Sequence, residues 1–264
     1  MTDILYHADH GIAVIRLNRP QALNAMTLEL MAELGAAFDR AADDGSVRAI
    51  ILTGEGRGFC SGADLVSSVV NPPRDTQGHL DLGLALERYY NPLVLKMRAL
   101  PKPIIAAVNG MAAGAGASLA LMADLTIAAR SAYFLQAFVN IGLIPDAGGT
   151  WLLPRSVGPQ RAMGLALLGE KLPAEKALEW GLIWEVVDDD QLMATVTALA
   201  QRLAAGPGIA IARIKRSLHA AAGHDLPEQL QLERELQREC GHSADFMEGA
   251  SAFMQKRKAK FQGC

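Results

Sequence analysis

Short apolar runs alternate with amphipathic stretches through the first half of the chain. Residues 11–17 (GIAVIRL) form a β-branched run that ends at an Asn-Arg-Pro turn, and residues 47–52 (VRAIIL) form a second one. Both runs predict buried strands. Between them, apolar residues recur at helical spacing from Leu30 to Phe38, behind Thr27, a residue type favoured at the N-cap. This β-α-β order predicts a mainly parallel sheet.

The alternation resumes after a long polar stretch. Residues 66–78 carry prolines, a glycine and polar side chains, which favours a mobile loop over a site. A helix with Tyr89 and Tyr90 is expected next. Residues 103–108 (PIIAAV) and 125–129 (LTIAA) then predict two more strands, joined through a glycine-rich turn and a helix.

The second half of the chain has helical periodicity. Residues 174–180, 192–204 and 209–222 carry apolar positions at helical spacing, and residues 205–264 contain no strand pattern. The chain ends in the basic tail KRKAKFQGC. We therefore predict an α/β fold with two regions, a core over residues 1–200 and a C-terminal helical region over residues 201–264.

Composition narrows the classes of partner. The chain has 264 residues, 50% of them hydrophobic and 20% charged, so it can bury a sizeable core. A net charge of -3 gives no broad basic face for nucleic acid. The most apolar stretch, residues 106–129, is interrupted by polar residues and glycines, which argues against a membrane span. The three scattered cysteines and an acidic N-terminus without a signal-peptide pattern indicate a cytoplasmic protein.

Two glycine-rich segments are candidates for a binding site. Residues 114–118 (GAGAS) open a predicted helix and partly resemble a dinucleotide fingerprint, but Leu119 stands where the third glycine is needed. Small residues at the start of a helix can also let a substrate carbonyl approach the backbone N–H groups. The alternative is that they only allow the helix to pack closely on the sheet. Residues 54–65 (GEGRGFCSGADL) follow a buried strand, where open parallel sheets place ligands. Besides Glu55, the charged residues of this segment are Arg57 and Asp64. A single arginine on a glycine-rich loop is more often simply exposed to solvent than part of a binding site.

Asp146 is the candidate acid or base. It lies in residues 142–150 (GLIPDAGGT), after an apolar run and between a proline and two glycines. Burial would raise the pKa of its carboxyl group and allow proton exchange near neutrality. The alternative is a helix cap, which is the more common use of Asp at such a position.

Other catalytic chemistries have little support in the sequence. The six histidines show no HExxH or HxH spacing and no pairing with cysteine, so we predict no metal. No GxSxG motif is present, and Cys60 is expected to be a small buried thiol.

Taken together and in order, these segments resemble the crotonase (enoyl-CoA hydratase/isomerase) superfamily nearly end to end. The matching segments are LNRPQALNAM, GRGFCSGADL, PKPIIAAVNGMAAGAGASLALMADLTIAA, GLIPDAGGTWLLPRSVG, the helical AEKALEWGL and the tail KRKAKF. The resemblance implies a spiral of β-β-α turns with a helical trimerisation region. It also implies an acyl-CoA substrate, with coenzyme A as part of the substrate and no separate cofactor, and a homotrimer or a dimer of trimers.

The resemblance also assigns roles to single residues. Two backbone N–H groups, of Ala63 and Ala115, would hold the thioester oxygen, and Asp146 would be the catalytic carboxylate. Phe253 and Lys256 would touch the nucleotide of a neighbouring subunit, whereas Gln21 replaces a frequent lysine there. The residues expected to bind substrate or coenzyme A are Ala22, Ala63, Asp64, Leu65, Val66, Ala115, Phe138, Phe253 and Lys256.

The reaction is also implied by the resemblance. Ser118 and Phe138 occupy the positions of the two hydratase glutamates, so simple hydration is disfavoured. Asp146, the stretch ERYYNPLV and the segment around GLIPDAGGTWLLPR most resemble the ring-1,2-epoxyphenylacetyl-CoA isomerases of phenylacetate catabolism. We therefore expect conversion of the epoxide to an oxepin, a shift of a 3,4 to a 2,3 double bond, or both. The alternatives are an enoyl-CoA hydratase, an aryl-CoA dehalogenase with Asp146 as nucleophile, or a non-catalytic coenzyme A-binding protein.

Overall fold

A computed structural model describes residues 2–65 and 74–263, and it contains two sheets. The larger sheet runs in the order β1-β2-β3-β5-β7-β10, with every neighbouring pair parallel except β1 and β2. Its strands are β1 (Ile4–Asp9), β2 (Ile12–Leu17), β3 (Ala49–Gly54), β5 (Ile104–Val108), β7 (Leu125–Ala129) and β10 (Glu185–Val187). The four longer parallel strands match the four predicted from sequence, and the mainly parallel sheet is confirmed.

A second, smaller sheet was not predicted. It runs in the order β4-β6-β8-β9, with β8 and β9 antiparallel. Its strands are β4 (Gly58–Cys60), β6 (Met111–Ala113), β8 (Tyr133–Leu135) and β9 (Lys171–Pro173). Three residues are too few to show an alternating pattern, and β4 lies inside the glycine-rich segment at residues 54–65. The periodicity therefore predicted the larger sheet and missed the smaller one.

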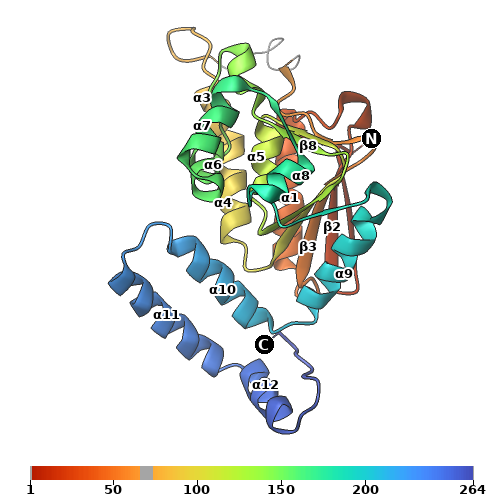
Figure 1. Cartoon of the computed structure of the whole chain (residues 1–264), viewed down its shortest axis with the longest axis vertical. Helices are drawn as coiled ribbons and strands as arrows, with labels where there is room; N and C mark the ends of the chain where they lie inside the picture. Colours follow the sequence, from red (N-terminus) through yellow and green to blue (C-terminus); the bar gives the residue numbers. More distant parts are fainter. Residues whose placement is uncertain (1, 66–73, 264) are drawn as a thin grey trace.

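Helices cover both sheets (Figure 1). Helix α1 (Leu28–Asp43) begins where expected, because the Thr27 side chain accepts a hydrogen bond from the Leu30 N–H at 3.1 Å. Helix α9 (Leu192–Ala204) packs on β2, β3, β5 and β7. The remaining helical elements of the core are η1 (Pro20–Ala22), α3 (Gly83–Ala85), η2 (Leu86–Tyr90), α4 (Asn91–Ala99), α5 (Ala115–Leu121), η3 (Ala137–Ile141), α6 (Gly149–Val157), α7 (Pro159–Leu168), α8 (Ala174–Glu179) and η4 (Asp189–Gln191).

Three further helices form an arm that extends away from the core, at the lower end of Figure 1. They are α10 (Gly208–Ala220), α11 (Leu226–Gly241) and α12 (Ala244–Met254). A buried ion pair joins the arm to the core: the Nζ atom of Lys215, in α10, lies 2.8 Å from Asp124 Oδ2. The α/β class and the C-terminal helical region are thus confirmed. The predicted boundary at residue 200 falls inside α9, and the division of the chain into these two regions stays a prediction.

Candidate active site

The first glycine-rich loop, residues 61–65, is fastened to residues 22–26 by backbone hydrogen bonds. The Ser61 N–H donates to Leu23 O at 3.0 Å, the Met26 N–H to Gly62 O at 2.8 Å, and the Asp64 N–H to Met26 O at 2.9 Å. These bonds engage the residues on both sides of Ala63 and leave its own N–H without a partner among the described residues.

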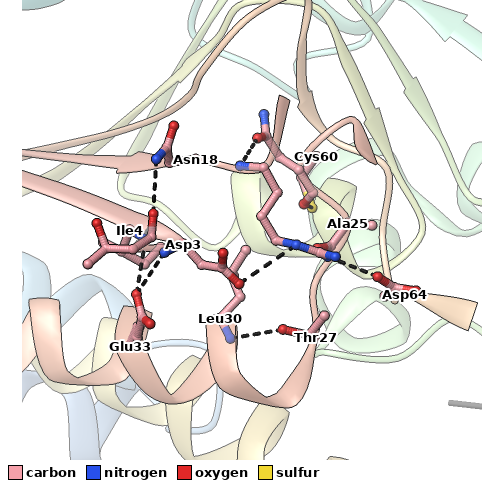
Figure 2. Close-up of polar contacts among 12 residues, drawn as sticks. Asp3, Ile4, Asn18, Ala25, Thr27, Leu30, Glu33, Cys60 and Asp64 are labelled. Atoms are coloured by element: carbon pink, nitrogen blue, oxygen red, sulfur yellow. Dashed lines mark hydrogen bonds and ion pairs between the residues drawn. The ribbon is translucent and has the colours of Figure 1, made fainter. Parts of the chain in front are cut away.

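Arg19 and Asn24 hold this loop in place, and sequence reasoning assigned neither residue a role. The Arg19 Nη1 donates to Ala25 O at 2.5 Å and to the Asp64 carboxylate at 2.9 Å, contacts drawn in Figure 2. The fully buried Asn24 side chain donates to Gly58 O at 2.8 Å and to Glu55 O at 3.0 Å, while it accepts from the Arg19 N–H at 2.9 Å. Asp64, predicted to border coenzyme A, therefore also anchors its own loop.

The second glycine-rich segment comes close to the first. Ala115 is the first residue of α5, where a backbone N–H has no partner inside the helix. A Cβ on Gly62 would lie only 3.6 Å from the Ala115 nitrogen and 3.0 Å from Ala113 O. Gly62 and Gly114 both have positive φ, +97° and +52°, which favours glycine at these turns. The structure thus brings the turn at Gly62, next to Ala63, close to the Ala115 nitrogen, and a joint role of the Ala63 and Ala115 N–H groups stays a prediction.

Asp146 lies in the loop that leads into α6. Burial raises the pKa of its carboxyl group to about 6, and its Oδ1 atom has no hydrogen-bond partner in the described part of the chain. Helix α6 has Gly148 as N-cap and no side-chain cap, so the alternative of a capping Asp is wrong. A carboxyl group with such a pKa can both accept and donate a proton near neutral pH.

Tyr90 is a further polar group of the site that sequence reasoning did not single out as functional. It is the last residue of the π-helical segment η2 and only 6% exposed. Burial raises the pKa of its phenol, and the negative charges of the Asp146 and Asp64 carboxylates raise it further. The phenol thus lies within electrostatic reach of both the Asp146 loop and the loop around Ala63, and it stays protonated at neutral pH.

Cys60 is inert at neutral pH. Its thiol is fully buried, burial raises its pKa to about 12, and its Sγ donates to Asn24 O at 3.1 Å. This agrees with the prediction of a small buried thiol.

The other predicted binding residues divide into two groups. Ala22 accepts a hydrogen bond from Ser61 Oγ at 3.3 Å, Leu65 is exposed, and the Phe138 ring comes within 3.9 Å of a Cβ built on Gly114, so all three border the two loops. Phe253 and Lys256 lie on and after α12, in the arm and away from α5 within the same chain (Figure 1). Val66 lies outside the described residues, as does most of the predicted loop over residues 66–78.

The described part of the chain has neither a cluster of metal-binding side chains nor a helix that could span a membrane. Over residues 2–65 and 74–263, no cluster of three or more His, Cys, Asp or Glu side chains has the geometry of a metal site. Over the same residues, every helix is too short or too polar to cross a membrane.

Comparison with known proteins identifies the family. A family profile described as enoyl-CoA hydratase/isomerase matches residues 7–264. The chain is 51% identical to a protein of Escherichia coli (strain K12) named 1,2-epoxyphenylacetyl-CoA isomerase, covering 100% of this chain and 99% of that one. It is 50% identical to a protein of Rhodobacter capsulatus named probable enoyl-CoA hydratase, covering 98% of each chain.

Solved structures agree with the sequence matches. The crystal structure of an enoyl-CoA hydratase from Bacillus anthracis superimposes with a TM-score of 0.91 at 32% identity, covering 99% of this chain and 100% of that one. The fold, the paired loops and the full-length sequence matches lead to one conclusion. The chain belongs to the enoyl-CoA hydratase/isomerase family.

Proposed function

We propose that this protein is an acyl-CoA isomerase that converts 1,2-epoxyphenylacetyl-CoA to the isomeric oxepin thioester, and that also moves a 3,4 double bond of an enoyl-CoA to the 2,3 position. The observation that carries the proposal is Asp146, a half-buried carboxyl group with a pKa of about 6 whose Oδ1 atom is unpartnered. The relative named 1,2-epoxyphenylacetyl-CoA isomerase, at 51% identity over the full chain, supports the choice of substrate.

In the proposed mechanism, the Ala63 and Ala115 N–H groups hold the thioester oxygen. Asp146 removes a proton from the carbon next to the thioester, and the electrons of that C–H bond move onto the oxygen. Two positioned N–H donors stabilise the resulting enolate, by about 3 kcal/mol per donor. Asp146 then returns the proton to a carbon further along the acyl group. In an enoyl-CoA this shifts the double bond; in the epoxide, the carbon–carbon bond of the three-membered ring also breaks, and its electrons complete the double bonds of the seven-membered oxepin. Both products are isomers of their substrates, so the proposed reaction uses no redox cofactor or metal. Coenzyme A enters only as part of the substrate.

Hydration is the main alternative within the family. The relative named as a hydratase is almost as similar as the isomerase, at 50% identity. Hydration, however, requires a carboxylate to activate water, whereas Ser118 and Phe138 stand at the positions that the family resemblance assigns to the hydratase glutamates. We therefore propose slow hydration of crotonyl-CoA, or none.

A mass-spectrometric assay separates these reactions. Purified protein is incubated with 1,2-epoxyphenylacetyl-CoA, with a 3-enoyl-CoA and with crotonyl-CoA. We expect new chromatographic peaks of unchanged mass for the first two thioesters. Rapid gain of one water on crotonyl-CoA would establish a hydratase, and halide release from 4-chlorobenzoyl-CoA would establish a dehalogenase. If the protein bound coenzyme A but converted none of these thioesters, it would be a non-catalytic coenzyme A-binding protein.

We also propose that the protein assembles as a homotrimer or a dimer of trimers in the cytoplasm. The arm exposes large apolar side chains in the single chain, which a neighbouring subunit could cover. They include Leu218, Leu226, Phe253 and Met254, exposed by 69%, 70%, 86% and 76%.

The nucleotide contact across subunits is testable at Lys256. If its ammonium group meets a phosphate of a neighbour's coenzyme A, Lys256→Ala should weaken coenzyme A binding roughly tenfold, while the exposed Lys258→Ala serves as control. Calorimetric titration at a protein concentration that keeps the oligomer intact measures the change. An unchanged dissociation constant for Lys256→Ala would remove the proposed contact.

A further inference from the structure

Two buried polar side chains near α5 lack hydrogen-bond partners. Ser118 is fully buried and Gln136 is 3% exposed. Neither Ser118 Oγ nor Gln136 Oε1 has a hydrogen-bond partner within the described part of the chain. Such groups are rare in folded proteins, because each gives up hydrogen bonds to water without replacement.

The two side chains face the same point in space. A Cβ built on Gly149 would lie 2.8 Å from Ser118 Oγ and 3.8 Å from Gln136 Oε1. Glycine at residue 149, the first residue of α6, therefore keeps a side chain out of the space beside the two oxygens. Three separate segments contribute to this arrangement, namely α5, the residue after β8 and the start of α6, so local turn chemistry does not explain it.

This pair is also fixed relative to the Ala115 N–H. Ser118 lies three residues after Ala115, and residues at this spacing are neighbours on the same helix face, about 5–6 Å apart. Gln136 directly follows β8, whose last residue, Leu135, accepts a hydrogen bond from the Gly114 N–H at 2.8 Å. Ser118 and Gln136 thus belong to the same rigid unit as the proposed thioester-oxygen site.

We propose that Ser118 and Gln136 form a subsite for an oxygen atom that the acyl group carries on a carbon β or γ to the thioester. This inference rests on the proposed function, in which the thioester oxygen is held at Ala115. An oxygen on these carbons is three or four bonds from the thioester carbon, a reach comparable with the spacing of about 5–6 Å between Ala115 and Ser118. The epoxide oxygen of 1,2-epoxyphenylacetyl-CoA bridges the β and γ carbons, and a hydrocarbon enoyl chain has no such atom.

The chemistry of the pair suits an oxygen ligand. The Ser118 hydroxyl can donate to an epoxide oxygen, which only accepts. The unpartnered atom of Gln136 is Oε1, which accepts, so it suits a hydroxyl oxygen that donates to it, while toward an epoxide oxygen the donor is Ser118. An apolar acyl chain would leave both groups without partners, so the site should favour oxygenated thioesters over their hydrocarbon analogues.

Binding of two inert thioesters tests the subsite directly. 2-Hydroxyphenylacetyl-CoA and phenylacetyl-CoA differ by one oxygen on the γ carbon, and their dissociation constants can be measured by calorimetry. We expect the parent protein to bind the hydroxylated thioester roughly five- to tenfold more tightly. Ser118→Ala and Gln136→Leu should each bring this ratio close to one while the dissociation constant for phenylacetyl-CoA stays within about threefold.

A matched control is Thr126→Val. The buried Thr126 hydroxyl donates to Ala120 O at 3.0 Å, so it is satisfied inside the protein. We expect this variant to keep the binding ratio but to melt at a lower temperature. Ser118→Ala should melt at the same or a higher temperature, because it removes a hydroxyl that has no partner. A fall in its melting temperature like that of Thr126→Val would assign Ser118 a structural role instead.

The outcomes separate this proposal from the proposed function. No preference for the hydroxylated thioester in the parent protein, or a preference that both variants retain, would overturn the subsite even if the epoxide is isomerised. Occupation of the pair by an ordered water alone would give the first of these results. A preference that both variants lose, in a protein that does not isomerise the epoxide, would overturn the proposed function and leave the subsite in place.

Discussion

The two sides of the candidate site differ in how their polar groups are satisfied. On the anchored side, defined as residues 19–26 with residues 60–65, Arg19, Asn24, Cys60 and Asp64 all have partners at hydrogen-bond distance. On the acyl side, defined as Ser118, Gln136 and Asp146, each side chain has a buried oxygen without a partner among the described residues.

This difference indicates that the anchored side stabilises the fold and that the acyl side takes part in the reaction. The anchored side fixes a backbone N–H before substrate arrives, and its fully satisfied network stabilises the fold. The acyl side leaves polar atoms unsatisfied, which lowers the stability of the folded chain but leaves these atoms available to a ligand or a proton. Substitutions on the anchored side should therefore reduce stability, and those on the acyl side should reduce turnover.

The largest expected effect is on turnover at Asp146. Asp146→Asn keeps the size of the side chain but cannot exchange a proton, so isomerisation should fall by roughly 10²-fold or more while binding of the thioester persists. Steady-state assay of the double-bond shift measures it, with the exposed Asp190→Asn as control. Turnover within a few-fold of the parent would show that the acyl side does not carry the chemistry.

The next effect is on stability at Asn24. Asn24→Ala removes three hydrogen bonds, exposes buried carbonyl groups to an apolar methyl, and places Ala at a φ of +56°, so unfolding free energy should fall by about 2 to 4 kcal/mol. Denaturant titration measures the loss. Asn18→Ala, which removes one exposed hydrogen bond to Thr2 O, should cost less than about 0.5 kcal/mol. Equal losses for the two variants would refute the assignment of a buried network.

A smaller effect is the pH dependence at Asp146. Its folded-state pKa, about 6, is raised above the value of about 3.9 expected in the unfolded chain, so the folded state binds the proton more tightly. The resulting stability is present below pH 4 and is lost as the pH rises through 6. Asp146→Asn lacks this loss. Its unfolding free energy should therefore rise by roughly 1 to 3 kcal/mol relative to that of the parent as the pH increases from 4 to 8. If the variant and the parent differed in unfolding free energy by the same amount at pH 4 and at pH 8, the raised pKa would be contradicted.

The same pKa sets the pH profile of the reaction. A carboxylate that removes a proton must be ionised, so turnover of the parent should rise as the pH increases through about 6.

The smallest effect is expected at Arg19. Lys keeps the charge but is shorter than Arg and has no counterpart to the Arg19 Nε, which lies 3.7 Å from Asp3 Oδ2, so Arg19→Lys should cost about 1 kcal/mol of stability. The control, Arg16→Lys, changes an ion pair with Glu55 whose side chains are 34% and 40% exposed, and it should cost less. The difference between the two thermal melts measures how far the anchored side depends on the guanidinium group.

Several features of the fold could be predicted from the sequence. Helix α1 with its Thr27 cap and strands β2, β3, β5 and β7 follow from residues that are neighbours in the chain, because periodicity and capping are local properties. The two glycine-rich segments and Asp146 also stood out, since glycines at tight turns and a carboxylate between Pro and Gly are visible without a structure.

Other features depended on contacts between distant segments. β1 alternates buried and more exposed positions at the edge of the sheet, and the strands of the smaller sheet are too short for a periodic signal. Arg19 meets Asp64 across 45 residues, so its role had no local signature. The family resemblance marked Ser118 as a lost glutamate position, but no sequence pattern connects Ser118 with Gln136.

Burial decided the chemistry of the site. The sequence allowed Asp146 to be a helix cap or a proton carrier, and both uses need the same residue type. Only the packing around the carboxyl group excludes the cap and raises its pKa to about 6, because desolvation is the summed effect of every element that surrounds the group. The residue types of this site were therefore set by the sequence, whereas their protonation and their unsatisfied hydrogen bonds were set by the tertiary structure.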